Sequence, residues 1–346
     1  MTMRFAGRAK ANLKMSDIAK IAGVAKSTVS RALADSDQVS RATKARIRQI
    51  ARDHGYQLDV SARDFRQSRS RTVKVLVPMG AAGVPKFADP FVMDLLASIA
   101  DTLSDRNYNI LLAKVALSSP EMIRDTFDTR HADGVIVIGQ RRFHDELNEM
   151  AESQVPLVVW GARFEDQKYC SVGSDNVAGA RAAVRHLIKR GRTRILFLGD
   201  TSMAEPKLRF DGYRTELVRA DIAFDESLVV ATKYDRLSAY SAMSRSIEAG
   251  LQFDAVFGTS DVVAMSAISA MHDHNIDVPR DVSVVGYDDI SLASYFSPAL
   301  TTVRQNIARA GGVLVDKVLH MAAGETVQSE VMPTELVVRK SCGAMG

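Results

Sequence analysis

Residues 16–56 read SDIAKIAGVAKSTVSRALADSDQVSRATKARIRQIARDHGY and contain three short amphipathic segments separated by turn signals. The pattern predicts a first helix with Ser16 as its N-cap and with Gly23 at its end, where a positive φ is needed. A second helix is predicted over 26–33, and a third follows Ser40 as its N-cap. Three short helices in about forty residues indicate a helix-turn-helix unit.

Each of these helices has one apolar face, which we expect to pack inward. In the second helix this face consists of Val29, Ala32 and Leu33. The residues of the third helix that we expect to pack inward are Ala42, Ala45, Ile47, Ile50 and Ala51. The exposed face of the second helix then carries side chains that are short and polar or cationic, as recognition of the DNA major groove requires.

Lys26 and Ser27, at the start of the second helix, are the candidate base contacts. Ser16 is predicted to hold a phosphate through its hydroxyl and the helix dipole. The candidate contacts to the DNA backbone or to an adjacent base are Thr28, Ser30 and Arg31. Periodicity alone also allows a small helical bundle with a solvated basic face.

The net charge of +4 conceals a strong asymmetry along the chain. Residues 1–71 contain 16 Lys and Arg against 6 Asp and no Glu, a balance of +10, whereas the remainder contains 29 against 35, a balance of −6. Lys and Arg that neutralise phosphates release condensed counterions and so favour DNA binding. A merely solubilising basic segment is the alternative explanation.

The segment DIAKIAGVAKSTVSRAL at 17–33 resembles the DNA-binding headpiece of the LacI/GalR family of transcriptional regulators, whose pattern is close to D-V-A-x-x-A-G-V-S-x-x-T-V-S-R-x-L. Ala25 stands where the family usually has Ser. We therefore expect a disordered basic tail over 1–14 and a DNA-binding domain over 15–58.

Residues 59–71, DVSARDFRQSRSR, have the composition of a linker. In the family that this chain resembles, the corresponding hinge folds on operator DNA, and a Leu wedges into the minor groove. Phe65 occupies that position here, so the resemblance implies an aromatic wedge, with Arg63 as a further DNA contact. Packing of Phe65 against a second subunit is the alternative.

The remainder, 72–346, is predicted to be a two-lobed α/β domain with two parallel, Rossmann-like sheets and crossovers between them. Its apolar runs are typical of strands covered on both faces and lie at 73–77, 109–113, 134–138, 156–160, 194–199, 254–258 and 282–286. Helices are expected at 90–106, 176–190 and 261–274. The predicted first lobe comprises about 72–170 and 303–331, and the predicted second lobe about 171–302 and 332–346.

This domain resembles the periplasmic-binding-protein-like effector domain of the same family, through VPRDVSVVGYDDI at 278–290, LTTVRQ at 300–305 and RFDGYRTEL at 209–217. The resemblance covers nearly the full chain. It implies a homodimer or a dimer of dimers that binds a palindromic operator. It also implies a small-molecule effector, most simply a carbohydrate, that controls operator affinity from a cleft between the lobes.

Ligands of open α/β sheets bind beyond the carboxyl ends of the strands. Arg209 and Asp288 follow such ends and form the pair of groups that recognises vicinal hydroxyls. Phe91 and Trp160 are candidate apolar contacts, although Trp160 also suits simple packing. Ser260 is a candidate hydroxyl contact to the effector, at a position where sugar-binding members of the family commonly have Asn.

The roles of Asp175 and Asp261 stay open between helix N-caps and ligands.

The sequence contains no Walker, G-x-G-x-x-G, G-x-S-x-G or H-E-x-x-H motif, so neither an enzyme nor a cofactor or metal site is predicted. Its two Cys residues, Cys170 and Cys342, lack metal spacing, and we expect both to be buried. No apolar run is long enough to span a membrane and no secretion signal is recognisable, so a cytoplasmic transcriptional repressor is predicted. A regulator that responds to a nucleobase or nucleotide and, less simply, a transporter's solute-binding protein are the alternatives.

Overall fold

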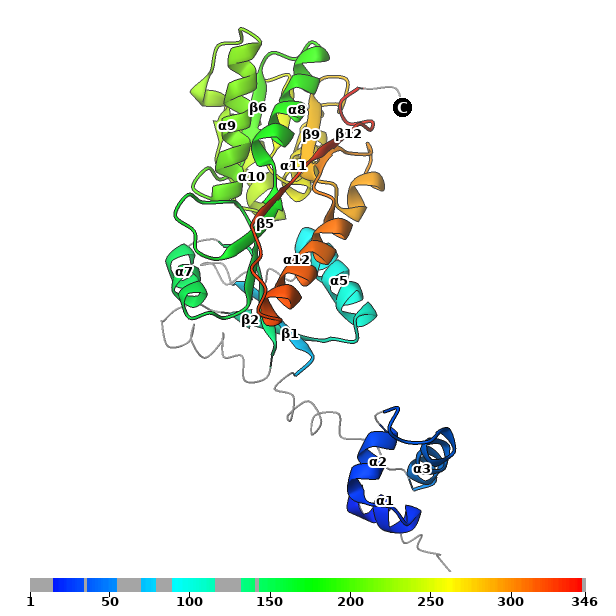
Figure 1. The fold of residues 1–346 in the computed structure, drawn as a ribbon. Helices are drawn as coiled ribbons and strands as arrows, with labels where there is room; N and C mark the ends of the chain where they lie inside the picture. The colour runs from blue at the N-terminus through cyan, green and yellow to red at the C-terminus, as the bar shows by residue number, and fades with distance from the viewer. Residues whose placement is uncertain are drawn as a thin grey trace, which may run out of the picture. The chain divides into compact units, whose positions relative to one another are not determined.

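The computed structural model divides the chain into two compact units, Met1–Arg69 and Ser70–Gly346, which we describe separately. Figure 1 shows the elements of each unit. The structure describes residues 15–33, 36–54, 70–78, 89–115, 132–140 and 143–343.

The first unit contains the three predicted helices, α1 (Met15–Ala22), α2 (Lys26–Leu33) and α3 (Arg41–Asp53). Their apolar faces meet in one small core. It consists of Ile18, Ala19, Ala22, Val29, Ala32, Val39 and Ile47. The three-helix prediction is confirmed.

The turns of this unit follow the predicted signals, with two corrections. Gly23 has a φ of +64°, and the hydroxyl of Ser40 accepts the backbone N–H of Thr43 at 3.2 Å, which caps α3. The helix α1 begins at Met15, two residues earlier than an N-cap at Ser16 implies, so Ser16 lies inside its first turn and is not the N-cap. Ala42 and Ala45 were predicted to pack inward but are exposed, because the buried stripe of α3 runs through Ile47 and Ala51 instead.

The second unit contains two six-stranded sheets, which confirms the two-lobed α/β prediction. The first sheet has the order β11-β5-β4-β3-β1-β2, with every neighbouring pair parallel. Its strands are β1 (Thr72–Pro78), β2 (Asn109–Val115), β3 (Gly134–Ile138), β4 (Leu157–Trp160), β5 (Cys170–Ser174) and β11 (Glu330–Met332). Alternate residues of β1 and β3 face opposite cores, as a covered parallel sheet requires.

The second sheet has the order β12-β10-β9-β8-β6-β7. Its strands are β6 (Ile195–Leu198), β7 (Val229–Val230), β8 (Ala255–Gly258), β9 (Ser283–Asp288), β10 (Thr301–Arg304) and β12 (Glu335–Val337). All pairs are parallel except β10 with β12, which is antiparallel.

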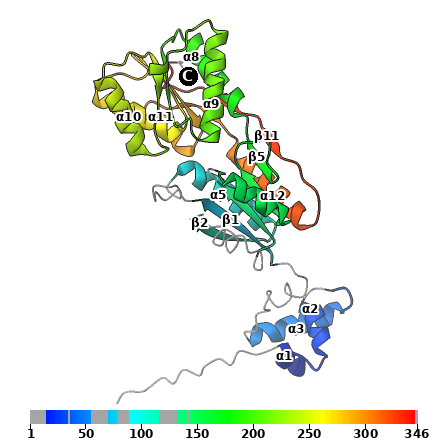
Figure 2. The same cartoon turned by 90° about the vertical axis from the view of Figure 1, so that its left-hand side faces the viewer.

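Helices cover both faces of each sheet. In the first lobe, α5 (Pro90–Asp105) and α12 (Ile307–Ala322) lie side by side on one face, and α7 (His144–Glu152) packs on the other (Figure 1). In the second lobe, one pair of helices covers each face (Figure 2). These pairs are α8 (Asn176–Lys189) with α9 (Ala204–Arg219), and α10 (Arg236–Glu248) with α11 (Asp261–Asp273).

The chain passes between the lobes three times, close to the predicted points. The strand β5 belongs wholly to the first sheet, so the first passage follows Ser174 rather than residue 170. The return passage follows β10, and the last joins β11 to β12. All three passages therefore adjoin the carboxyl ends of strands β5, β10 and β11.

The strand β2 differs from the prediction of a strand buried on both faces. It lies at the edge of the first sheet, and its apolar residues Ile110, Leu111 and Leu112 are 38%, 42% and 45% exposed. Apolar composition signals a strand here but does not distinguish an inner strand from an edge.

Candidate functional site

A cavity lies between the two lobes, at the carboxyl ends of strands from both sheets. Trp160 ends β4, Ser174 ends β5 and Asp288 ends β9, and all three line the cavity. This is the position at which open α/β sheets bind ligands. The lining residues that contribute polar groups are Asp89, Gln140, Ser174, Asn176, Glu205, Arg209, Tyr234, Asp288 and Gln305.

Arg209 and Asp288 form a buried pair on the wall of the second lobe. Arg209 Nη1 lies 3.8 Å from Asp288 Oδ1, and the guanidinium stacks 3.7 Å from the centroid of the Tyr287 ring. Arg209 Nε donates to Asn176 Oδ1 at 2.8 Å, and Nη1 also donates to the carbonyl of Thr259. These contacts fix the guanidinium plane before any ligand binds, which is how a binding site lowers its ordering cost.

A second set of polar contacts holds the Asp288 carboxylate. Gln305 Nε2 donates to Asp288 Oδ1 at 2.6 Å, and Ser174 Oγ donates to Gln305 Oε1 at 2.6 Å. Burial raises the pKa of Asp288 well above the ordinary value, although Arg209 opposes the shift. Because Ser174 belongs to the first sheet and Asp288 to the second, this chain of bonds joins the two lobes at the cavity lining.

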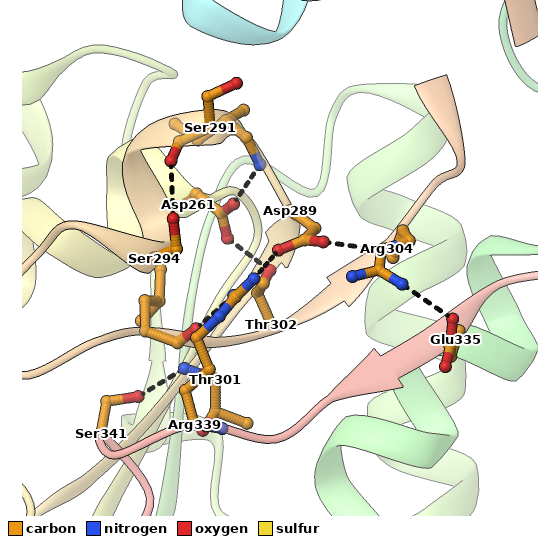
Figure 3. Close-up of polar contacts among 12 residues, drawn as sticks. Asp261, Asp289, Ser291, Ser294, Thr301, Thr302, Arg304, Glu335, Arg339 and Ser341 are labelled. Carbon is orange, nitrogen blue, oxygen red and sulfur yellow. Dashed lines mark hydrogen bonds and ion pairs between the residues drawn. The ribbon is translucent and has the colours of Figure 1, made fainter. Parts of the chain in front are cut away.

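The backbone that presents Asp288 is strained. Asp288 and Asp289 have φ values of +123° and +56°, in the region that residues with a Cβ rarely adopt. Figure 3 shows the Asp289 carboxylate between two guanidinium groups, accepting from Arg304 Nε at 2.7 Å and from Arg339 Nη2 at 2.6 Å. This ion pair network stabilises the strained turn and hence the position of Asp288.

The same turn is also held by Asp261, at the start of α11. Its Oδ2 accepts the backbone N–H of Ile290 at 2.9 Å, and its Oδ1 accepts the hydroxyl of Thr302 (Figure 3). Burial raises the pKa of Asp261 to about 7, against the effect of both hydrogen bonds. Asp261 therefore supports the site from outside the cavity lining.

Two aromatic rings belong to the apolar part of the cavity lining, which also includes Val92, Ile138, Met203 and Pro206. Phe91, in the first turn of α5, lies 5.9 Å from Trp160 between ring centroids, with a tilt of 42°. Phe91 also packs against the buried cores of both lobes. An apolar face beside a few fixed polar groups is the usual composition of a small-molecule site.

In the first unit, the start of α2 presents the exposed side chains of Lys26 and Ser27. Arg31 is exposed one turn later on the same helix, whereas Val29 and Ala32 are buried in the core. A short helix with an exposed polar N-terminus has the geometry of a major-groove recognition helix.

Comparisons with known proteins match both units. Residues 14–59 match the model for bacterial regulatory proteins of the lacI family, and 184–342 match the periplasmic binding protein-like domain. The HTH-type transcriptional regulator CelR of Thermobifida fusca is 31% identical over 331 residues, which cover 94% of this chain and 96% of CelR. The chain belongs to the LacI family.

Two further matches of this LacI-family chain span nearly its full length. The HTH-type transcriptional regulator MalR of Clostridium butyricum is 29% identical over 339 residues, which cover 95% of this chain and 99% of MalR. A solved structure described as a CelR–cellobiose complex superposes with a TM-score of 0.70 at 30% identity, over 95% of this chain and 99% of that one. The chain is thus a DNA-binding transcriptional regulator of the LacI type.

The cavity of this LacI-family domain brings together four of the five predicted effector residues, Phe91, Trp160, Arg209 and Asp288. Ser260 is the exception, because it does not line the cavity and its hydroxyl accepts the backbone N–H of Val263 at 3.2 Å as the N-cap of α11.

The question left open for two aspartates is also answered. Asp175 is the N-cap of α8, and Asp261 is the buried support described above.

Several polar lining residues were missed by the sequence argument, namely Gln140, Asn176, Glu205, Tyr234 and Gln305. Gln305 lies at the end of the quoted LTTVRQ segment, one residue beyond β10, so its place after a strand was the signal available. The predicted DNA contacts Arg63 and Phe65 lie outside the described residues. Among the helices that the structure describes, none is long and apolar enough to cross a membrane.

Proposed function

We propose that a small carbohydrate binds between the two lobes and controls the affinity of this regulator for operator DNA, most simply as a repressor. The observation that carries the proposal is the cavity itself, whose lining contains both the Arg209–Asp288 pair and the Phe91–Trp160 pair. Sugars present hydroxyl edges and an apolar ring face, and these two pairs complement both. The similar CelR–cellobiose structure supports the same class of ligand.

We propose that α2 enters the major groove of a palindromic operator. Lys26 and Ser27 would contact bases there, and Ser16 would hold a phosphate. The proposed contacts to the backbone or to an adjacent base are Thr28, Ser30 and Arg31. A bacterial regulator with this function acts in the cytoplasm and needs no catalytic group.

We propose that the effector domain forms a homodimer through apolar surface near the junction of the lobes. Tyr295 is 84% exposed, Leu292 53% and Met93 48%, an exposure unusual for such side chains. The backbone N–H of Ser291, next to Leu292, donates to Oδ2 of Asp94, next to Met93, at 3.4 Å, so α5 and the 3₁₀ turn Ser291–Ser294 adjoin one another. Self-association would bury these apolar side chains.

The aromatic pair also suits the flat face of a nucleobase, so the test includes both ligand classes. Thermal unfolding of the full chain is measured with glucose, ribose, cellobiose, adenine and adenosine. A ligand at about 100 times its Kd is expected to add about 2.7 kcal/mol to the free energy of unfolding. Stabilisation by a sugar supports the proposal, whereas stabilisation by adenine or adenosine alone contradicts the carbohydrate assignment.

A further inference from the structure

Gln140, which follows β3 in the first lobe, carries a buried acceptor that no residue in the described part of the chain satisfies. The residue is 1% exposed and lines the cavity. Its Oε1 has no hydrogen-bond partner among the described residues. A buried acceptor left without a partner costs about 1–3 kcal/mol, so such an atom in a native protein calls for a ligand or water.

The orientation of the Gln140 amide is fixed by its other end. Nε2 donates to the carbonyl of Ala162 at 2.5 Å and to the hydroxyl of Tyr169 at 3.0 Å. Because a carbonyl can only accept, the nitrogen must face Ala162, and the oxygen must point away from it. The Tyr169 hydroxyl is itself held by His144 Nδ1 at 2.9 Å.

The backbone beside the free oxygen is glycine. A Cβ on Gly161, which also lines the cavity, would lie 2.5 Å from Gln140 Oε1. Because Gly161 has no side chain, Gln140 Oε1 can occupy this position beside the cavity wall. Any larger residue at this position would displace the Gln140 side chain.

We propose that Gln140 Oε1 is the first lobe's hydrogen-bond acceptor for the effector and takes a hydroxyl donor, while Tyr169 is a positioning residue that holds the amide. The inference rests on the proposed carbohydrate function. Arg209 and Asp288 belong to the second lobe, so a sugar bound to them and to Gln140 bridges the lobes. Bridging contacts favour the closed arrangement, because a ligand shifts a conformational equilibrium by its differential affinity.

The test uses the full chain with whichever of glucose, ribose and cellobiose binds most tightly by isothermal titration. Gln140→Met keeps the length of the side chain but removes the acceptor, and is expected to raise Kd about 10-fold. Gly161→Ala is expected to weaken binding as well. The control is Gln252→Met, which removes an exposed amide that donates to the carbonyl of Gly250 at 3.0 Å and lies outside the cavity lining, and it should leave Kd unchanged.

A double-mutant cycle tests the positioning role of Tyr169. Tyr169→Phe should raise Kd several-fold in the wild-type background and have no effect on Kd in the Gln140→Met background. A purely structural role would give the same loss in both backgrounds and would overturn this assignment.

An unchanged sugar Kd in both Gln140→Met and Gly161→Ala would overturn the acceptor role of Gln140. It would not contradict the proposal that the effector is a carbohydrate. If none of the three sugars binds wild-type protein, the proposed function itself is contradicted, and this inference with it.

Discussion

Replacing Arg209 by Ala separates effector recognition from DNA binding. The guanidinium is buried, 4% exposed, and no other described cation lines the cavity. A hydrogen bond to a charged group contributes about 1.5–3 kcal/mol, so loss of one such contact to a sugar hydroxyl should raise the effector Kd about 10- to 100-fold. Lys26 and the rest of α2 belong to the other compact unit, so operator affinity without effector should be unchanged.

The same substitution should also reduce stability. Removing one member of a buried ion pair costs about 3–5 kcal/mol because the other charge stays buried. The raised pKa of Asp288 lets this carboxyl take up a proton, so we expect about 3 kcal/mol, at the lower end. Adding Asp288→Asn to Arg209→Ala should restore part of this loss, since no unpaired charge then remains.

Isothermal titration with the sugar, urea unfolding and fluorescence anisotropy with a selected palindromic duplex measure the three effects. Arg194→Ala is the matched control, because Arg194 pairs with Asp225 at 3.3 Å on the surface of the same lobe. Unchanged sugar affinity in Arg209→Ala would refute the role of the pair. Loss of both sugar and DNA binding would instead show that the variant misfolds.

Three further substitutions test other parts of the structure. Asp261→Asn should flatten the pH dependence of stability: the folded-state pKa of about 7 lies above the unfolded value, so Asp261 makes the wild type less stable as pH rises from about 4 to about 7, which urea unfolding at several pH values would detect. Ala25→Ser should stabilise the first unit by up to about 1 kcal/mol, because Ala25 immediately precedes α2 and cannot cap it; thermal unfolding that is unchanged would refute this cap. Lys26→Ala should weaken binding to the selected duplex by about 1–3 kcal/mol with reduced discrimination at one base pair, whereas a uniform loss across sequences would indicate a phosphate contact instead.

The strands with apolar runs could be predicted from the sequence. A strand without such a run, and the strands between which it lies, could not. The strand β5, Cys170–Ser174, contains Ser and Gly and has no apolar run, yet all five residues are buried between β4 and β11. Its burial depends on residues far along the chain, since the backbone N–H of Ser171 donates to the hydroxyl of Ser329. The local composition of 170–174 does not indicate such a contact.

In the candidate site, too, some residues could be predicted from the sequence and others could not. The places of Arg209 and Asp288 in the cavity lining were predictable because Asp288 ends a strand, Arg209 lies in the helix after a strand, and both match family segments. Gln140 and Gln305 were missed because an amide after a strand has many ordinary roles, and only the assembled lobes show which groups face the cavity. Ser260 does not line the cavity and caps α11 instead, and the sequence could not separate these two places because a serine before a helix suits an N-cap as well as a ligand.

The most direct test of the account is the effector Kd of the full chain, measured by isothermal titration with and without saturating operator duplex. The account predicts that the duplex changes the sugar's Kd, and that the sugar changes the duplex's Kd by the same factor. Equal sugar affinities in the two titrations would contradict it, because binding between the lobes would then be uncoupled from DNA.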